Sequence, residues 1–65
     1  MFVIVNGETR PLPEPPNLRI LLVALSPSPP FVVACNEAIV PRYAYADYRL
    51  CSGDRIEIVH PSVGG

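Results

Sequence analysis

The sequence predicts an α+β domain in which one short helix packs on a four- or five-stranded mixed sheet. The chain has 65 residues, which suffice for one small domain and not for two. Only one segment has apolar residues at helical spacing, whereas several short runs rich in β-branched residues lie between turn signals. A single helix can cover only one face of a sheet, so the other face should stay open.

Proline marks the joints of the chain and spares its apolar runs. Seven of the nine prolines lie at residues 11–16 and 27–30, whereas Pro41 and Pro61 stand alone. Proline interrupts helices and cannot donate to a β ladder, so these positions separate elements. With 49% hydrophobic and 17% charged residues, the segments between them are expected to fold.

A β-hairpin is expected to open the fold. Phe2–Val5 is an aromatic and β-branched run, and it is closed by Asn6-Gly7, the dipeptide typical of a two-residue hairpin turn. The second strand, around Glu8–Leu12, contains Pro11. Because proline lacks the N–H that a ladder needs, this strand should lie at an edge or end early.

The one helix is expected after the first proline cluster. Asn17 is a suitable N-cap, and Ser26-Pro27 should end the helix. Four leucines at spacings i, i+3, i+4 and i+7 share one face: Leu18, Leu21, Leu22 and Leu25. A helix of roughly two to three turns is marginal in isolation, so its leucines should pack on the sheet.

A second hairpin and a crossover follow the helix. The runs Phe31–Cys35 and Ala38–Val40 flank Asn36-Glu37, which should form the turn between two strands. Arg42–Arg49 contains three tyrosines and two alanines without a clear period. We expect this segment to be an irregular crossover that can include one helical turn.

The last strand leads directly to the C-terminal segment. After the turn Gly53-Asp54, Arg55–Val59 alternates polar and apolar residues as a half-buried strand does. The residues beyond it have no apolar period and end on Gly64-Gly65. We therefore divide the chain into a folded domain at residues 1–60 and a flexible tail at residues 61–65.

The paired glycines at the end of the tail have two interpretations. Termini are commonly disordered and glycine packs against nothing, so a frayed end is the plainer one. Alternatively, the carboxylate of Gly65 is itself a substrate. Glycines without side chains give such a carboxylate a narrow and permissive lead into a partner's active site.

Four segments form a recognisable combination. They are Val5–Glu8, Cys35–Arg42, Ser52–Val59 and Gly64-Gly65. In this combination the chain resembles the ThiS sulfur-carrier proteins of thiamine biosynthesis, which share the β-grasp fold with ubiquitin. The resemblance extends over nearly the whole chain and implies a ubiquitin-like β-grasp domain.

The resemblance also implies a function for the tail, which consists of Val63, Gly64 and the attachment residue Gly65. An E1-like adenylating enzyme of the ThiF type would use ATP to adenylate Gly65. Sulfur from a donor such as a cysteine desulfurase would then replace AMP and leave a thiocarboxylate. A thiazole synthase of the ThiG type would receive this sulfur for the thiazole ring. The carrier would supply no catalytic side chain and would bind neither a cofactor nor a metal.

Strand alternation predicts which residues lie on the open face of a β-grasp sheet. The residues expected to face the helix are Val3, Val5, Val33, Cys35, Ile56 and Ile58. Those expected on the open side are Phe2, Ile4, Val32, Ala34 and Val59. We expect these five to converge beside the tail, and we interpret Phe2, Ile4, Ala34 and Val59 as contacts for the adenylating enzyme. Scattered exposed apolar residues, however, need no explanation.

Charge and composition exclude several functional classes. The net charge is −1, and the arginines are scattered, unlike the basic footprint of a nucleic-acid binder. No apolar run approaches the length of a membrane span and no signal peptide is visible, so we expect a cytoplasmic protein without membrane contact. Cys35, Cys51 and His60 lack metal-ligand spacing, and no motif pairs Cys51 with His60 for catalysis.

Two other functions remain open on the sequence alone. A sulfur carrier for molybdopterin or for another acceptor would use the same chemistry and differ only in the final enzyme. A non-covalent ubiquitin-like interaction module would use the same fold and leave its terminus unmodified.

Overall fold

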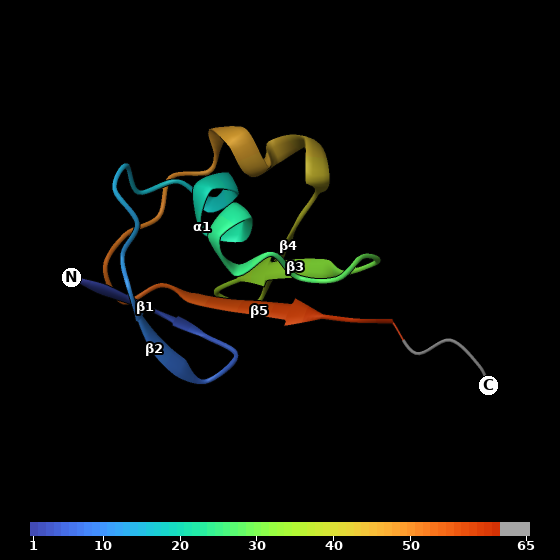
Figure 1. The fold of residues 1–65 in the computed structure, drawn as a ribbon, viewed down its shortest axis with the longest axis horizontal. Coiled ribbons are helices and arrows are strands. Elements are labelled where there is room, and N and C mark those ends of the chain that lie inside the picture. Colours follow the sequence, from blue (N-terminus) through green and yellow to red (C-terminus); the bar gives the residue numbers. More distant parts are fainter. Residues whose placement is uncertain (62–65) are drawn as a thin grey trace.

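The order of elements agrees with the order that the sequence predicts. A computed structural model describes residues 1–61 and forms an α+β domain (Figure 1). Its elements are β1 (Phe2–Val5), β2 (Glu8–Pro11), α1 (Leu18–Leu25), β3 (Val32–Cys35), β4 (Ala38–Val40), the 3₁₀ helix η1 (Arg42–Asp47) and β5 (Arg55–Val59). Helices α1 and η1 contact each other on the same side of the sheet, and no helix of residues 1–61 lies on the opposite face (Figure 1).

The five strands form one mixed sheet in the order β2-β1-β5-β3-β4. The central strand β5 is parallel to β1 and antiparallel to β3. Strand β2, which contains Pro11, lies at an edge as expected, because proline leaves one ladder donor missing. The strand that leads to the C-terminus is therefore the innermost of the sheet.

Both predicted two-residue turns are present. Asn6 and Gly7 have φ angles of 48° and 83°, which match the left-handed backbone of a type I′ hairpin turn. Asn36 and Glu37 have φ angles of 51° and 70° in the second hairpin. Glycine would fit more easily at position 37, since residues other than Asn, Asp and Gly rarely adopt a positive φ.

The core is formed by the leucine face of α1 and the covered face of the sheet. Its buried residues are Val3, Val5, Leu18, Leu21, Leu22, Val33, Cys35, Val40, Leu50 and Ile56. Ile58 is half-buried and packs against them, so the predicted inward face is confirmed. Val40 and Leu50 join the core in addition to the residues expected from alternation. Leu50 is fixed in place by its N–H, which donates to Pro16 O at 2.9 Å.

The crossover is more regular than the sequence indicates. Helix is present in this crossover, as the expectation allowed, but it is longer than one turn, because Arg42–Asp47 forms a six-residue 3₁₀ helix. Its half-buried Ala44 and Tyr45 pack against the core. A 3₁₀ helix has three residues per turn, so residues three apart lie directly above one another. The apolar spacing of an α-helix, with 3.6 residues per turn, therefore does not identify it.

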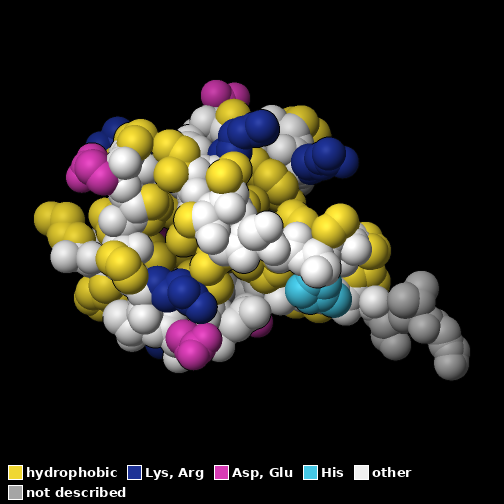
Figure 2. All heavy atoms as spheres, viewed as in Figure 1, with side chains coloured by type: hydrophobic (Ala, Val, Ile, Leu, Met, Phe, Trp, Pro, Cys, Tyr) yellow, Lys and Arg dark blue, Asp and Glu magenta, His cyan; other side chains and the backbone are white. Residues whose placement is uncertain are grey.

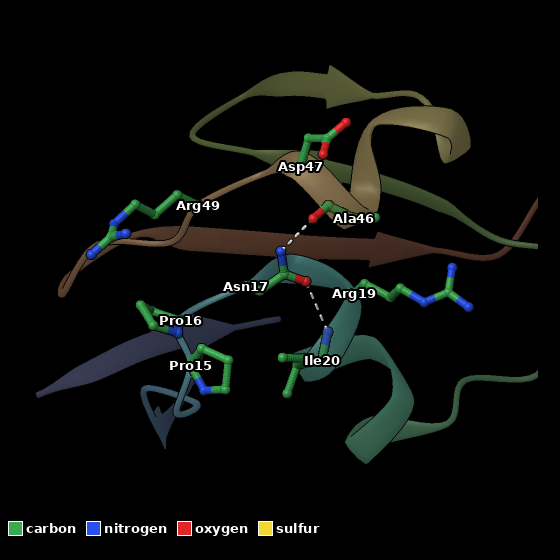
Figure 3. Close-up of a pocket in the computed structure, with 8 residues that line it drawn as sticks. All are labelled: Pro15, Pro16, Asn17, Arg19, Ile20, Ala46, Asp47 and Arg49. Atoms are coloured by element: carbon green, nitrogen blue, oxygen red, sulfur yellow. Dashed lines mark hydrogen bonds between the residues drawn. The ribbon is translucent and has the colours of Figure 1, made fainter.

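Asn17 joins α1 to η1 as well as capping the helix. Its Oδ1 accepts a hydrogen bond from Ile20 N at 3.2 Å, and its Nδ2 donates to Ala46 O at 2.7 Å (Figure 3). Arg19 and Arg49 line the same hollow but point away from each other (Figure 3). The hollow is therefore organised around a structural asparagine.

Substitution of this cap tests its double role. Asn17→Ala is expected to lower the free energy of unfolding by about 1–2 kcal/mol, because both the cap and the link to η1 are lost. Asn17→Ser retains the capping acceptor and should lose less. Urea unfolding of the three chains measures the difference. An unchanged midpoint for Asn17→Ala would contradict this role.

Candidate functional site

The tail lies almost entirely outside the described residues. Within residues 61–65 only Pro61 is described, so the predictions for Val63, Gly64 and Gly65 concern positions beyond the described part of the chain. The domain boundary at residue 60 stays a prediction for the same reason. The site is therefore built from the base of the tail and from the surface around it.

The base of the tail is the end of the central strand. β5 runs through the middle of the sheet (Figure 1), and its last residue, Val59, pairs with Val32 of β3. His60 then packs edge-on against Phe31, with ring centroids 6.4 Å apart. Hydrophobic side chains lie beside this histidine on the surface that Figure 2 shows. The chain thus leaves the sheet next to apolar side chains.

The open face of the sheet carries an apolar group near this exit. We name it the tail-side patch: Val32, Ala34, Ile39 and Val59. Val32 pairs with Val59, and Ala34 pairs with Ile39, so the four residues lie on one face of three neighbouring strands. Val59 is 54% exposed and Ile39 is 71% exposed. The patch is open because α1 covers the opposite face.

The expectation that five apolar residues converge beside the tail is wrong for Phe2 and Ile4. Both lie on the open face, but Ile4 pairs with Arg55 at the start of β5. Gly53 N donates to Phe2 O at 2.7 Å, which places Phe2 before β5 begins. At roughly 3.3 Å per residue, Phe2 and Val59 are separated by about 20 Å along the strands. The structure thus brings together Val32, Ala34 and Val59 and leaves Phe2 and Ile4 at the far end.

Ile39 is a patch residue that the sequence reasoning missed. The sequence predicts a strand at Ala38–Val40 without placing its residues on either face. Val40 is buried, so alternation along β4 would have placed Ile39 on the open face. The open face is also less uniformly apolar than expected. Arg55 and Glu57 occupy it between the two apolar groups.

The cysteines and the histidine do not form a reactive group. Cys51 comes before β5 and His60 comes after it, so the strand separates the two residues. Cys35 is buried in the hydrophobic core, on the face of the sheet that α1 covers. Within residues 1–61, no cluster of metal-ligating side chains is found, and no helix is long and apolar enough to cross a membrane.

Burial raises the pKa of the Cys35 thiol above its ordinary value of 9.0, although a hydrogen bond from the Tyr48 hydroxyl opposes the rise. Burial also raises the pKa of Tyr48 above 10.0. Thiolates are the reactive form of cysteine, so Cys35 should be inert in the folded protein.

Thiol reactivity checks this assignment. With an alkylating reagent under native conditions, the exposed Cys51 is expected to react quickly, whereas Cys35 should react only as fast as the protein unfolds. Cys51→Ser should remove the fast reaction and leave the slow one. Two equally fast thiols in the folded protein would show that Cys35 is accessible.

The same shift predicts how stability depends on pH. The unfolded chain releases the Cys35 proton near pH 9.0, before the folded chain does. The stabilisation is therefore fully present below that pH and is lost as pH rises through the folded-state pKa. We expect the free energy of unfolding to fall above pH 9.0, and to fall less steeply in Cys35→Ala. Equal slopes in the two chains would contradict the assignment.

Comparisons with known proteins agree with the family resemblance and with the fold. The sequence model of the ThiS family matches residues 3–65. The crystal structure of the thiamine biosynthesis protein ThiS from Geobacter metallireducens is similar over 100% of both chains, with a TM-score of 0.82 and 26% sequence identity. A search of curated proteins finds no match. The likeness confirms the expected ubiquitin-like β-grasp fold, with one short helix on a five-stranded mixed sheet.

Proposed function

The chain belongs to the ThiS family of small sulfur carriers in thiamine biosynthesis, and we propose on this basis that it carries sulfur as a thiocarboxylate on Gly65. The observation that carries the proposal is the extent of the family match, which includes Gly64-Gly65. The position of the base of the tail supports it, since the tail follows the central strand in the sequence and that strand ends beside an exposed apolar patch.

The proposed chemistry needs activation of a carboxylate. A free carboxylate is a poor acyl electrophile, because attack on it must expel oxide. In the proposal, a carboxylate oxygen of Gly65 attacks the α-phosphorus of ATP and pyrophosphate leaves. The terminal sulfur of a persulfide then attacks the acyl adenylate and displaces AMP, which leaves an acyl disulfide. A thiol cleaves the S–S bond of this disulfide, so the thiocarboxylate is released and the thiols are oxidised to a disulfide. The mixed anhydride divides one difficult substitution into two easier ones.

In this proposal the partners supply the catalytic groups. An E1-like enzyme of the ThiF type adenylates the tail with ATP, a cysteine desulfurase supplies the sulfur, and a ThiG-type thiazole synthase receives it. The carrier acts as their co-substrate and holds no cofactor. The burial of Cys35 and the separation of Cys51 from His60 support this division of roles. Because the adenylation step depends on the ATP pool of the cell, we expect a cytoplasmic location.

We further assign the tail-side patch as the docking surface for the adenylating enzyme. The patch includes Val59, the last residue of the strand that leads to the tail, so one enzyme can hold the patch while its active site receives Gly65. Phe2 and Ile4, at the far end of the open face, fall outside this docking surface. Exposed apolar patches of this kind are common at protein interfaces.

Complementation in cells tests the proposed acceptor. The chain should restore growth without thiamine to a strain that lacks its own thiamine sulfur carrier. It should not restore molybdopterin synthesis to a strain that lacks that carrier. The reverse result would assign the chain to molybdopterin, and failure in both strains would favour a non-covalent interaction module.

A further inference from the structure

The last part of the central strand has a neighbouring strand on only one side. β3 pairs with β5 as far as Val59, whereas the ladder between β1 and β5 ends at the pair Val5 and Ile56. Beyond that pair, β1 turns away into the hairpin that begins at Asn6. The segment of β5 that leads to the tail would therefore have an open edge just before the exit.

Asn6 closes this edge with its backbone and its side chain. Its N–H donates to Ile56 O at 2.9 Å, which continues the ladder. Its Oδ1 accepts from Ile58 N at 2.8 Å, and its Nδ2 donates to Ile58 O at 3.3 Å. A carboxamide has one acceptor and one donor group, as a peptide unit has, so it substitutes for the next residue of the missing strand.

The turn by itself does not require this side chain. The φ of 48° at residue 6 suits Asn, Asp or Gly. Of these three residues only asparagine has a carboxamide, which can both accept a hydrogen bond from Ile58 N and donate one to Ile58 O. The choice of asparagine thus serves a contact that joins residues 52 positions apart in the sequence.

A second asparagine holds the opposite end of the same strand. Asn36 has a φ of 51° in the other hairpin. Its Oδ1 accepts from Arg55 N at 3.0 Å, and its N–H donates to Arg55 O at 2.7 Å. The two asparagines therefore have similar backbone geometry, and each accepts a β5 amide through Oδ1. Asn36 Nδ2 donates instead to Asp54 Oδ1 at 3.2 Å, and only Asn6 acts next to the tail.

We propose that Asn6 is a positioning residue for sulfur loading, which fixes the direction in which the tail leaves the sheet by holding both main-chain groups of Ile58. This inference rests on the proposed function of the tail. With Asn6 on one edge and β3 on the other, the peptide units before His60 are held on both sides. The base of the tail then has a fixed orientation relative to the tail-side patch. A docked enzyme therefore does not have to order the base of the tail before it receives the terminus.

The test compares Asn6→Gly with Asn36→Gly. Glycine can adopt the backbone of both turns, and each substitution removes the side-chain hydrogen bonds of one asparagine. In the folded protein, Asn6→Gly should expose the Ile58 amide to hydrogen exchange, whereas Asn36→Gly should not. Thermal unfolding gives the folded fraction of each chain, and rates are compared per folded molecule.

The decisive measurement is the adenylation of each carrier by the adenylating enzyme of the same organism, followed as ATP–pyrophosphate exchange. Asn6→Gly should lower kcat about tenfold, the size expected when one or two net hydrogen bonds that order the terminus are lost. Its KM should change less than about twofold, because the patch is intact. Asn36→Gly should change neither constant by more than about twofold.

Two results would overturn the proposal, and they can be told apart. If the unchanged chain is adenylated and Asn6→Gly retains the kcat of Asn36→Gly, Asn6 has only a structural role. If the unchanged chain is not adenylated at all, the proposed function fails and the positioning role fails with it.

Discussion

Addition of one valine after Gly65 is expected to abolish sulfur loading while the fold stays intact. The extra residue moves the carboxylate by about 3.5 Å and gives it a side chain. A misplacement of about 1 Å can already cost a reaction about a hundredfold, so the shifted terminus should not react measurably. Deletion of Gly65 should have the same effect. Intact mass after incubation with ATP, adenylating enzyme and sulfur donor measures the loss.

The control for this prediction is an extension at the other end. Met1 is 93% exposed, so one residue added before it should leave loading unchanged. Circular dichroism should show the same fold for the unchanged chain, for both extended chains and for the chain without Gly65. Full loading of the chain that ends in valine would mean that the reaction does not require Gly65 at the terminus.

Charges on the tail-side patch are expected to weaken binding of the adenylating enzyme strongly. Val59→Arg and Ile39→Arg each place a guanidinium where an apolar contact is proposed, and central interface residues can account for about 2 kcal/mol or more. This corresponds to a loss of affinity of about thirtyfold or more. Both side chains are exposed, so stability should change by less than about 0.5 kcal/mol. Titration calorimetry with the enzyme measures the affinity.

Helix α1 offers a matched control for the patch. Val23 is 70% exposed, nearly the same as Ile39 at 71%, but it lies on the helix that covers the other face of the sheet. Val23→Arg adds the same charge and should leave the affinity within about twofold. Equal weakening by Val23→Arg and Ile39→Arg would show a general effect of charge and would remove the patch from the interface.

Local sequence signals were sufficient for most of the fold. Asn6-Gly7 identified the first hairpin because its turn needs two residues that tolerate positive φ. The spacing of the leucines identified α1, and the N-cap and helix end follow from Asn17 and Ser26. In each case the residues that indicate an element belong to that element or lie within a few positions of it in the sequence.

The position of Phe2 could not be obtained in this way. Its face follows from alternation, but its distance from the tail depends on the register between β1 and β5. That register joins segments about fifty positions apart, Ile4 with Arg55 and Val5 with Ile56. Hydrophobic alternation is unchanged when a strand moves by two residues, so it fixes the face and leaves the register open.

The contact between Asn6 and Ile58 was hidden for a similar reason. Asn6 was assigned to its turn, and the turn fully accounts for an asparagine at that position. Its second role arises only because the parallel pairing of β1 and β5 brings the hairpin turn beside the end of β5. A local motif can therefore be read correctly and still leave out the long-range contact of the same side chain.

The most direct measurement is the mass of the carrier after the complete loading reaction, followed by fragmentation of the intact protein. We predict that one oxygen is replaced by one sulfur and that every fragment bearing the change contains Gly65. Fragments that contain Cys35 or Cys51 but lack Gly65 should keep their original mass. A carrier of unchanged mass, or added sulfur located on a cysteine, would contradict the central claim that the terminal carboxylate holds the sulfur.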